Sequence, residues 1–405
     1  MVAAVSSWRA DDGPGRAVEL ITSGRARTRT ALAEALGLAR STLGQRLQPL
    51  LASGLVLESE ELVSSGGRPS RALRLNPRAG VVISIDVGEE RTRVAITDLD
   101  AAILAERVLT LRLDDGPEEL LETISTAARQ ALQESDLLGV PVAGIGLGLP
   151  AAVDFRAGRV SGWSIMSGWD GFDIRGHLRR TWQVPVLVDN DVNVQTVAEH
   201  HRFWPQVSHL FYVKIGTGVG SGMVIDGCVN RGAQGVAGDI GHAHVGGHGD
   251  PQCRCGNRGC LESLVGGWAL ARDLRGDSHP QMHDARDVAR QAKLGEVDAV
   301  TRLRAAGRIL GEAVAFSANL LNPDVIVLGG LLSASGDHLM AGVLESIYQR
   351  SLPLTTRKLR IVPTGYRSRS GIAGATYLVR DHVLDPARLD RLLGAGLGPF
   401  AVDEN

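Results

Sequence analysis

Three of the four cysteines in the chain stand within eight residues, at Cys253, Cys255 and Cys260. Three thiolates on a tight, Gly-containing loop suit a tetrahedral Zn²⁺ ion, which needs a fourth ligand from another segment. The candidates for that ligand are His242, His244 and His248. A closed site of this kind has no open position for catalytic water, so we expect structural zinc. The alternative is three reduced free thiols, which would be an oxidation liability.

Four polar residues end an apolar segment: Asp189, Asn190, Asp191 and Asn193. Sugar hydroxyl groups need convergent hydrogen-bond donors and acceptors, and an Asn beside an Asp supplies both. The alternative for this group is a set of satisfied turn residues.

Two loops have sequences that could meet phosphate groups: Asp86–Thr92 (DVGEERT) and Gly216–Gly222 (GTGVGSG). ATP phosphates need backbone N–H groups and little competing negative charge. Glu89 and Glu90 place two carboxylates in the first loop, where they would repel phosphates. The second loop alone is weak evidence, because Gly-rich hairpins also serve as packing turns. We therefore expect no kinase activity.

Charge is distributed unevenly along the chain. Residues 1–80 contain 11 Arg, no Lys and 7 Asp or Glu, a net charge of +4, whereas the remainder carries −6. A basic head on an acidic body favours a head that contacts phosphates, and a solvated Arg-rich surface is the alternative. The overall composition, 44% hydrophobic and 22% charged, is typical of a globular protein and excludes a disordered chain.

Neither a membrane span nor a signal peptide is predicted. The uncharged run Leu137–Val153 is too short and too often interrupted by Gly and Pro to cross a bilayer. The first residues lack an apolar core followed by a cleavage site. With so few cysteines, three of them clustered, we expect a cytoplasmic protein with a metal site.

The sequence of the basic head predicts a winged helix-turn-helix. Helices are expected over residues 16–23, 30–36 and 41–52, with Gly37 ending the second and Ser41 or Thr42 capping the third. A short β pair follows and returns at Arg71–Leu75. The third helix would read bases in the major groove, and the Gly/Pro-rich arm at 64–71 would reach a minor groove. The expected DNA-binding residues are Ser41, Thr42, Gln45, Arg46, Arg68 and Arg71; a three-helix domain that binds protein is the alternative.

The body alternates strands with helices, which predicts an α/β fold. Two segments, IDVGEERTRVAI and KIGTGVGSGMVI, each begin with a strand, a Gly-rich turn and a second strand. They indicate two related halves with a cleft between them. The expected domains are a head with its linker arm (1–78), a first lobe (79–194, with a C-terminal helix at about 385–400) and a second lobe with the zinc loop (195–384).

The segment GDIGHAHVGGHGDPQCRCGNRGCLES, residues 238–263, is the most specific motif of the chain. With it, the chain resembles the ROK family of repressors and sugar kinases. The resemblance covers nearly the whole chain, including the winged-helix head of the repressor branch. It implies a duplicated actin-like, ribonuclease-H-like body with two lobes.

The resemblance also implies roles for individual residues. The zinc histidine of the family corresponds to His242, beside Cys253, Cys255 and Cys260. Its sugar-binding residues correspond to Asn190, Asp191, Asp239, His242 and Glu262, of which Asp191 has the position of the kinase general base. Asp239 departs from the usual Glu and is one methylene shorter, which puts glucose-type specificity in question. In the first loop, Glu89, Glu90 and Arg91 replace the second Gly and the Thr-Lys pair of kinase members.

Together these features predict a sugar-responsive, DNA-binding transcriptional regulator, most simply a repressor of carbohydrate-use genes. Its expected partners are operator DNA, a sugar or sugar phosphate in the interlobe cleft, and further copies of itself in a homodimer or homotetramer. One alternative is an ATP-dependent sugar kinase with a regulatory DNA-binding head. Another is a zinc-stabilised regulator that responds to a protein partner.

Overall fold

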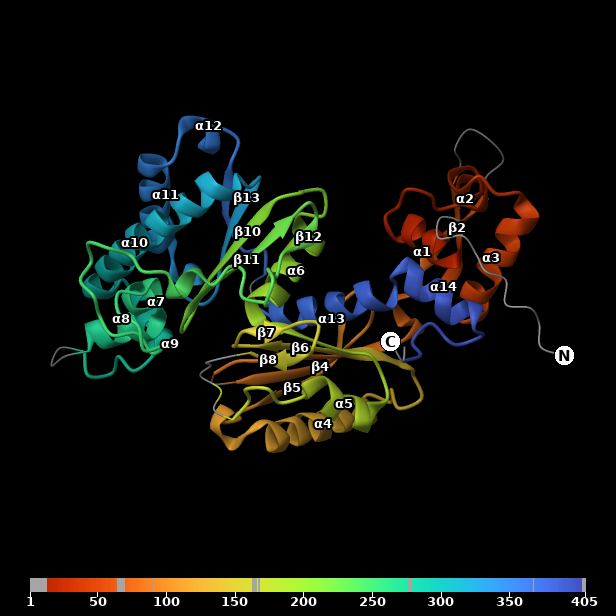
Figure 1. Cartoon of the computed structure of the whole chain (residues 1–405), viewed down its shortest axis with the longest axis horizontal. Helices are drawn as coiled ribbons and strands as arrows, with labels where there is room; N and C mark the ends of the chain where they lie inside the picture. The colour runs from red at the N-terminus through yellow and green to blue at the C-terminus, as the bar shows by residue number, and fades with distance from the viewer. Residues whose placement is uncertain are drawn as a thin grey trace. The chain divides into compact units, whose positions relative to one another are not determined.

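The computed structural model describes residues 13–63, 70–89, 91–161, 166, 168–275, 279–366 and 368–402 (Figure 1). The chain forms two compact units. The first unit contains residues 1–148, 172–188 and 375–405, and the second contains residues 149–171 and 189–374. This grouping differs from the predicted lobes at three places: residues 149–171 and 189–194 lie with the second unit, and residues 375–384 lie with the first. Within the described residues, no helix has the length and apolar character that a bilayer crossing requires.

The head has the predicted order of elements. Its helices are α1 (Pro14–Thr22), α2 (Arg29–Leu36) and α3 (Arg40–Ala52), followed by the antiparallel strands β1 (Val56–Val63) and β2 (Ser70–Leu75). Gly37 ends α2 in the left-handed conformation, with φ of 65°, which Gly adopts without a steric penalty. Leu43, Leu47 and Leu50 form the buried side of α3. The prediction of a helix-turn-helix with a β pair is confirmed.

The predicted cap of the third helix is wrong. Helix α3 begins at Arg40, so its N-cap is Ala39, and no side chain bonds the free N–H groups there. Ser41 and Thr42 lie inside the first turn, past the position from which a hydroxyl can accept from those groups. Thr28 does cap α2, accepting from the Ala31 N–H at 3.2 Å. Of the predicted minor-groove arm, Arg68 lies outside the described residues.

The sheet of the first unit has five strands in the order β5-β4-β3-β6-β9. Strands β3 (Val81–Val87), β4 (Thr92–Thr97) and β5 (Ile103–Leu109) form an antiparallel meander, and β6 (Val142–Leu149) runs parallel to β3. Strand β9 (Val186–Asn190) completes the edge. Helices α4 (Pro117–Glu134) and α5 (Ile174–Trp182) lie on one side of this sheet and α13 (Ser370–Val383) on the other (Figure 1).

Helix α13 joins the first unit through buried polar contacts. The Thr376 hydroxyl lies 2.8 Å from both the Ser84 and the Thr97 hydroxyls, and all three side chains are buried. Gly146 permits a close approach, because a Cβ there would stand 2.1 Å from the Ala375 carbonyl oxygen. Contacts between residues so far apart in sequence explain why the helix was assigned to the other lobe from sequence.

The head packs against the C-terminal segment of the chain. Helix α14 (Pro386–Gly394) packs on α1, and the Asp390 carboxylate accepts from the Gly15 N–H at 2.8 Å. Leu389 belongs to the same apolar cluster as Leu43 of α3 and Val82 of β3. The C-terminal helix therefore completes the apolar core shared with the head.

The sheet of the second unit repeats the arrangement of the first, with the order β12-β11-β10-β13-β14. Strands β10 (Leu210–Ile215), β11 (Val219–Ile225) and β12 (Cys228–Val229) are antiparallel neighbours. Strands β13 (Val325–Gly329) and β14 (Arg360–Pro363) run parallel to β10. The same order of antiparallel and parallel neighbours confirms the predicted duplication of an actin-like half.

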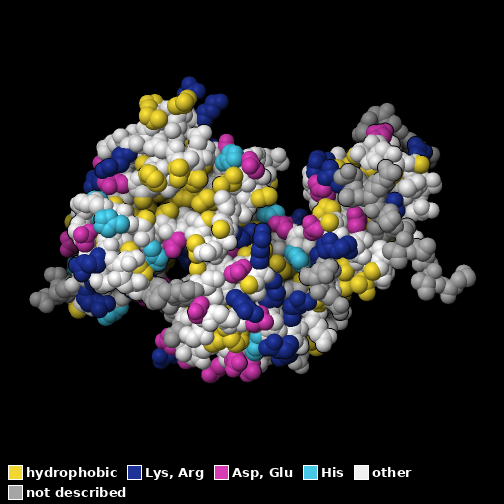
Figure 2. Space-filling view, viewed as in Figure 1, with side chains coloured by type: hydrophobic (Ala, Val, Ile, Leu, Met, Phe, Trp, Pro, Cys, Tyr) yellow, Lys and Arg dark blue, Asp and Glu magenta, His cyan; other side chains and the backbone are white. Residues whose placement is uncertain are grey.

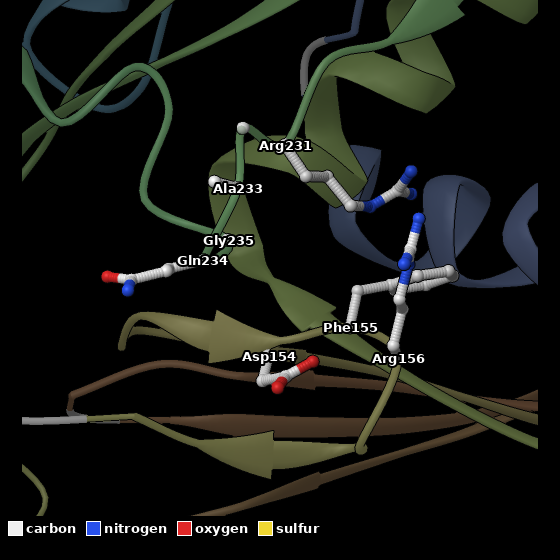
Figure 3. A pocket seen from close by; sticks show the side chains of 8 residues that line it. Asp154, Phe155, Arg156, Arg231, Ala233, Gln234 and Gly235 are labelled. Carbon is white, nitrogen blue, oxygen red and sulfur yellow. The ribbon is translucent and has the colours of Figure 1, made fainter.

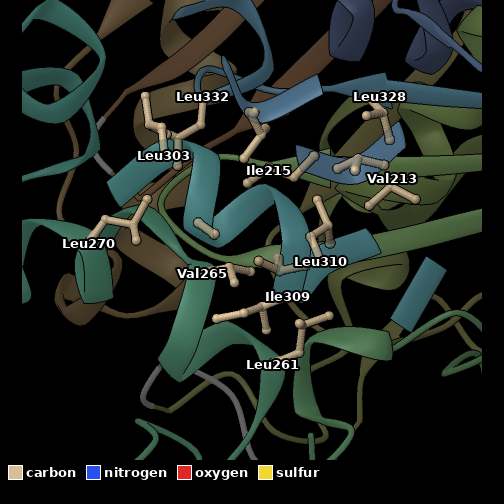
Figure 4. Packing of buried hydrophobic residues seen from close by; sticks show 14 of the residues in the cluster. Val213, Ile215, Leu261, Val265, Leu270, Leu303, Ile309, Leu310, Leu328 and Leu332 are labelled. Atoms are coloured by element: carbon tan, nitrogen blue, oxygen red, sulfur yellow. The ribbon is translucent and has the colours of Figure 1, made fainter. Parts of the chain in front are cut away.

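Helices cover the second sheet and bury its apolar core. Helix α6 (Asp191–Phe203) packs on β10 and β11. The larger core lies under α7 (Leu261–Val265), α8 (Gly267–Leu274), α9 (Ala285–Lys293) and α10 (Val297–Leu321), with α11 (Asp337–Arg350) paired to α10. Val213, Leu310 and Leu328 are fully buried there (Figure 4). This packing makes the hairpin β10–β11 a rigid support for the loops around it.

Candidate functional site

The structure brings the three clustered cysteines and one histidine together. The Cys255 and Cys260 sulfurs lie 3.7 Å apart, and the Cys253 sulfur lies 3.7 Å from Nδ1 of His242. The four donor atoms all lie within 4.8 Å of one another. A tetrahedral ion with Zn–S bonds of about 2.3 Å sets its sulfur ligands about 3.8 Å apart, so this spacing fits zinc. Burial, with the neighbouring thiols, raises the pKa of Cys260 to about 12, so a cation is needed to hold its thiolate at neutral pH.

The structure also distinguishes among the three histidines that were candidates for the fourth metal ligand. Only His242 joins the cluster among the described residues. His244 lies 3.2 Å from Asp250, and His248 lies 3.3 Å from Glu312. The Cys253 sulfur faces Nδ1 of His242, so Nε2 is the ring nitrogen proposed for another partner.

Asn190 is fixed at the start of helix α6. Its side-chain oxygen accepts from the Val192 N–H at 2.9 Å and from the Asn193 N–H at 3.3 Å, which makes it the N-cap of the helix. Its amide nitrogen donates to the Ala151 carbonyl oxygen at 3.0 Å. Such bonds hold the amide in one rotamer, as a residue that orients a ligand requires.

Asp191 forms an ion pair with Lys214 that the sequence interpretation missed. Lys214 lies on β10, and its ammonium group bonds Oδ2 of Asp191. The carboxylate side chain is only 6% exposed and the lysine 28%. A charged residue inside the otherwise apolar strand LFYVKI was the signal available in the sequence.

Glu262 is held against the Gly-rich hairpin. Its Oε2 accepts from the Val219 N–H at 3.0 Å, and its Oε1 accepts from the Trp268 indole N–H at 3.1 Å. A Cβ at Gly218 would stand 2.4 Å from Oε2. At least this Gly of the GTGVGSG loop is therefore required for packing against Glu262, independently of any phosphate.

Asp239 and His242 are placed by the same hairpin. The Ser221 N–H of β11 donates to the Gly238 carbonyl oxygen at 3.0 Å, and a Cβ at Gly241 would stand 2.1 Å from the Val219 carbonyl oxygen. Although Asp239 reaches solvent, partial loss of hydration raises its pKa; nearby His242 opposes this rise and Glu262 adds to it. Asp239, His242 and Glu262 thus lie close enough to interact.

A second ion pair, between Asp189 and Arg231, adjoins the predicted sugar-binding residue Asn190. Asp189 is fully buried, and its Oδ2 bonds Nε of Arg231 at 2.7 Å. Its Oδ1 accepts from the Asn190 N–H at 2.8 Å and from the Asn193 amide at 3.1 Å. Burial raises the pKa of Asp189, and Arg231 acts against that rise. Arg231, which the sequence interpretation also missed, therefore supports the position of Asn190.

The predicted DNA-binding residues lie on α3 and β2. Ser41 and Gln45 are exposed, Thr42 and Arg46 are half-buried, and Arg71 is exposed on β2. Figure 2 shows several basic side chains on the visible face of the head, and all basic residues of the head are Arg. In the first predicted phosphate loop, the Gly88 N–H donates to the Arg91 carbonyl oxygen at 3.0 Å in a tight turn. Glu89 lies in this turn, and Glu90 lies outside the described residues.

Comparison with known proteins assigns the chain to a family. The sequence profile of the ROK family matches residues 82–382. The chain therefore belongs to the ROK family. The resemblance drawn from residues 238–263 is confirmed.

Relatives within this family include both regulators and kinases. The chain is 27% identical to a putative xylose repressor of Caldicellulosiruptor sp. strain Rt8B.4, over 91% of this chain and 95% of that protein. It is 29% identical to a glucokinase of Halalkalibacterium halodurans, but over 74% of this chain and 94% of that protein. A ROK family transcriptional regulator, homologous to the Escherichia coli MLC protein, has a similar structure, with a TM-score of 0.79 and 24% identity over 93% of this chain and 97% of the other.

Proposed function

We propose that the protein is a sugar-responsive transcriptional repressor that binds operator DNA through its head. The observation that carries this proposal is the winged helix-turn-helix, with the exposed polar face of α3, joined to a ROK body. The repressor relative matches the chain across 91% of its length, whereas the glucokinase matches 74%. Such a protein acts in the cytoplasm, where the DNA is.

The proposed effector site is the group around the hairpin β10–β11. Asn190, Asp191, Asp239, His242 and Glu262 all belong to the second unit. Their amide, carboxylate and imidazole groups supply the donors and acceptors that sugar hydroxyls need. The effector acts only to the extent that it binds the two DNA-binding states with different affinity.

Zinc is the proposed metal of the cluster formed by His242, Cys253, Cys255 and Cys260. The spacing of the donor atoms and the three thiol ligands support this choice. Zinc on Nδ1 would fix the tautomer of His242 and leave an N–H at Nε2 for a sugar hydroxyl. The metal therefore shapes one wall of the effector site and has no catalytic role.

We infer that the protein does not phosphorylate its sugar. Glu89 and Glu90 of the first loop would place carboxylates where they repel ATP phosphates. Transfer of phosphate from ATP to any hexose at an ordinary turnover would contradict this inference.

The function is tested by selecting bound fragments from sheared genomic DNA at about 0.15 M salt, with and without a pool of sugars; the salt is fixed because non-specific binding depends steeply on it. A few enriched palindromic sites, lost or gained with one sugar, are expected. The variant Gln45→Ala should relax base preference, because Asn and Gln side chains read adenine. Gln133→Ala, in helix α4 outside the head, is the matched control. Enrichment of no site would refute the proposal.

A further inference from the structure

Arg254 lies in the cysteine loop and reaches Glu262 of the proposed effector site. It stands between Cys253 and Cys255, two members of the cluster. Its Nη2 donates to Oε1 of Glu262 at 3.4 Å, and its guanidinium carbon lies 5.2 Å from the centroid of the Trp268 ring. The Trp268 indole N–H donates to the same oxygen at 3.1 Å. Two donors from separate segments therefore converge on one oxygen of Glu262.

The hydrogen bonds of Glu262 use most of its acceptor capacity within the part of the chain that the structure describes. An ionised carboxylate offers about four lone-pair sites, shared equally by its two oxygens. Trp268 and Arg254 occupy both sites on Oε1, and the Val219 N–H, at 3.0 Å, occupies one on Oε2. The side chain is 10% exposed. A hydroxyl group that enters the site therefore meets one remaining acceptor direction, on Oε2.

Arg254 also offsets the negative charge of Glu262. Partial loss of hydration raises the pKa of Asp239, and the nearby charge of Glu262 raises it further, so the two carboxylates repel each other. A guanidinium group beside one of them reduces this repulsion. Because the Arg254 side chain is 33% exposed, its ion pair contributes little to the stability of the fold. The contact therefore serves to orient Glu262.

Arg231 has the same arrangement beside Asn190. Its Nε bonds buried Asp189 at 2.7 Å, and its guanidinium carbon lies 3.9 Å from the centroid of the Phe155 ring (Figure 3). Phe155 lies in the turn between β7 (Val153–Asp154) and β8 (Arg159–Val160). In both places an aromatic ring supports the planar guanidinium group, which restricts the directions in which it can donate.

The position of Arg254 depends on the fold of the cysteine loop. The Cys253 N–H donates to the Asn257 carbonyl oxygen at 2.8 Å, and the Gly256 N–H donates to the Cys253 carbonyl oxygen at 3.1 Å. These bonds close a tight turn that contains Arg254. The same turn supplies two sulfur atoms of the cluster and the guanidinium group that meets Glu262.

We propose that Arg254 is a positioning residue that connects the cysteine loop to the effector site. It holds the Glu262 carboxylate so that the remaining acceptor direction of Oε2 meets one hydroxyl group of the sugar. This inference rests on the proposed function, because it takes Glu262 as a residue that binds the effector.

The test is calorimetric titration of the full chain with glucose, xylose and N-acetylglucosamine, together with elemental analysis of zinc. For the sugar that the wild type binds most tightly, Arg254→Gln should weaken binding about tenfold, the order expected for loss of one charge-assisted contact. Zinc content should stay at the wild-type level. Arg254→Lys, which keeps the charge, should recover part of the affinity. Arg258→Gln removes the same charge from the same loop, where Arg258 bonds exposed Gln252 at 3.4 Å, and should change neither property.

In a Glu262→Gln background, Arg254→Gln should add little to the loss of affinity, because the carboxylate through which it acts is already gone. Full addition of the two losses, or wild-type affinity in Arg254→Gln, would overturn the inference and leave the proposed function standing. A fall in zinc content that accompanies the fall in affinity would also overturn it, since Arg254 would then act on the loop itself. If the wild type binds no sugar of the panel, the proposed effector site fails and the inference fails with it.

Discussion

At the scale of single residues, the ion pair of Lys214 and Asp191 lies in the proposed effector site. The Lys214 ammonium bonds Oδ2 of Asp191, and Oδ1 of the same carboxylate is the proposed acceptor for a sugar hydroxyl. The Asp191 side chain is nearly buried, whereas Lys214 is partly exposed. Each member therefore depends on the other for charge compensation.

Replacing Lys214 by Met should destabilise the protein by about 3 kcal/mol, the lower end of the range for removing one partner of a buried pair, because Lys214 is partly exposed. Chemical denaturation measures the loss. The double variant with Asp191→Asn should recover much of it, since no uncompensated charge remains. If the losses of unfolding free energy in the two single variants simply add in the double variant, Lys214 and Asp191 do not stabilise each other.

Glu199 gives the stability a defined pH dependence. Burial raises its pKa from 4.5, although the Gly365 N–H (3.0 Å) and the Thr364 hydroxyl (2.7 Å) favour the ionised form. The folded state therefore holds the proton more tightly than the unfolded state. Protonated Glu199 therefore stabilises the folded state, fully so at pH values below its pKa in the unfolded chain. This stabilisation is lost as the pH rises through the raised pKa of Glu199 in the folded protein.

The variant Glu199→Gln should flatten that fall in stability, because Gln carries no titrating proton and can still bond Thr364 and Gly365. Denaturation at several pH values between about 4 and 8 measures the slope. Glu134→Gln, which removes a carboxylate that is 67% exposed, serves as control and should leave the slope unchanged. Equal slopes in the wild type and Glu199→Gln would disprove the assignment.

At the scale of elements, the loop from Asp239 to Glu262 has little regular structure of its own. Its secondary structure is limited to the 3₁₀ turn η3 (Ile240–His242), isolated bridges and the first residues of α7. Its organisation comes from the contacts with β11 and from the cluster of His242 with three cysteines. Removal of the proposed zinc should therefore disorder the loop and, with it, His242 and Glu262.

We expect about one zinc ion per chain in protein purified without chelator, measured by elemental analysis. The variant Cys255→Ser should lower the zinc content, the unfolding temperature and sugar affinity together. Cys228→Ser, at an exposed cysteine outside the cluster, should change none of them. Zinc content well below one per chain, with sugar affinity retained, would contradict the proposed role of the metal.

The elements also show what the sequence could and could not predict. Apolar periodicity and Gly37 sufficed for the helices of the head, because these are local properties. The partners of Asp189 and Asp191 are Arg231 and Lys214, which lie 42 and 23 residues away in the chain. Pairing of this kind across strands and helices depends on the topology, so motifs in the sequence suggested candidate sugar-binding residues but not the cations that pair with their neighbours.

At the scale of the whole molecule, a group of large apolar side chains on α10, α11 and α12 is exposed. Phe316 and Leu320 on α10, Tyr348 on α11, and Leu352 and Leu354 at α12 (Pro353–Thr356) are each at least 60% exposed. Asn319 joins the two segments, bonding the Arg350 carbonyl oxygen and the Leu352 N–H. Hydrophobic side chains gather over α12 in Figure 2. Contiguous apolar surface of this kind marks protein interfaces.

A second copy of the chain is the occupant that the proposed function calls for, because an operator with two half-sites about 34 Å apart needs two heads held together. The double variant Leu320→Glu with Leu352→Glu should therefore dissociate the protein to monomers in sedimentation equilibrium and weaken operator binding by far more than tenfold, since one half-site alone is then held. Leu138→Glu, at a leucine that is 67% exposed in the first unit, is the control and should leave both properties unchanged. A wild-type protein that is monomeric at micromolar concentration yet binds its operator tightly would show that the two heads are joined by the DNA and that this surface serves another partner.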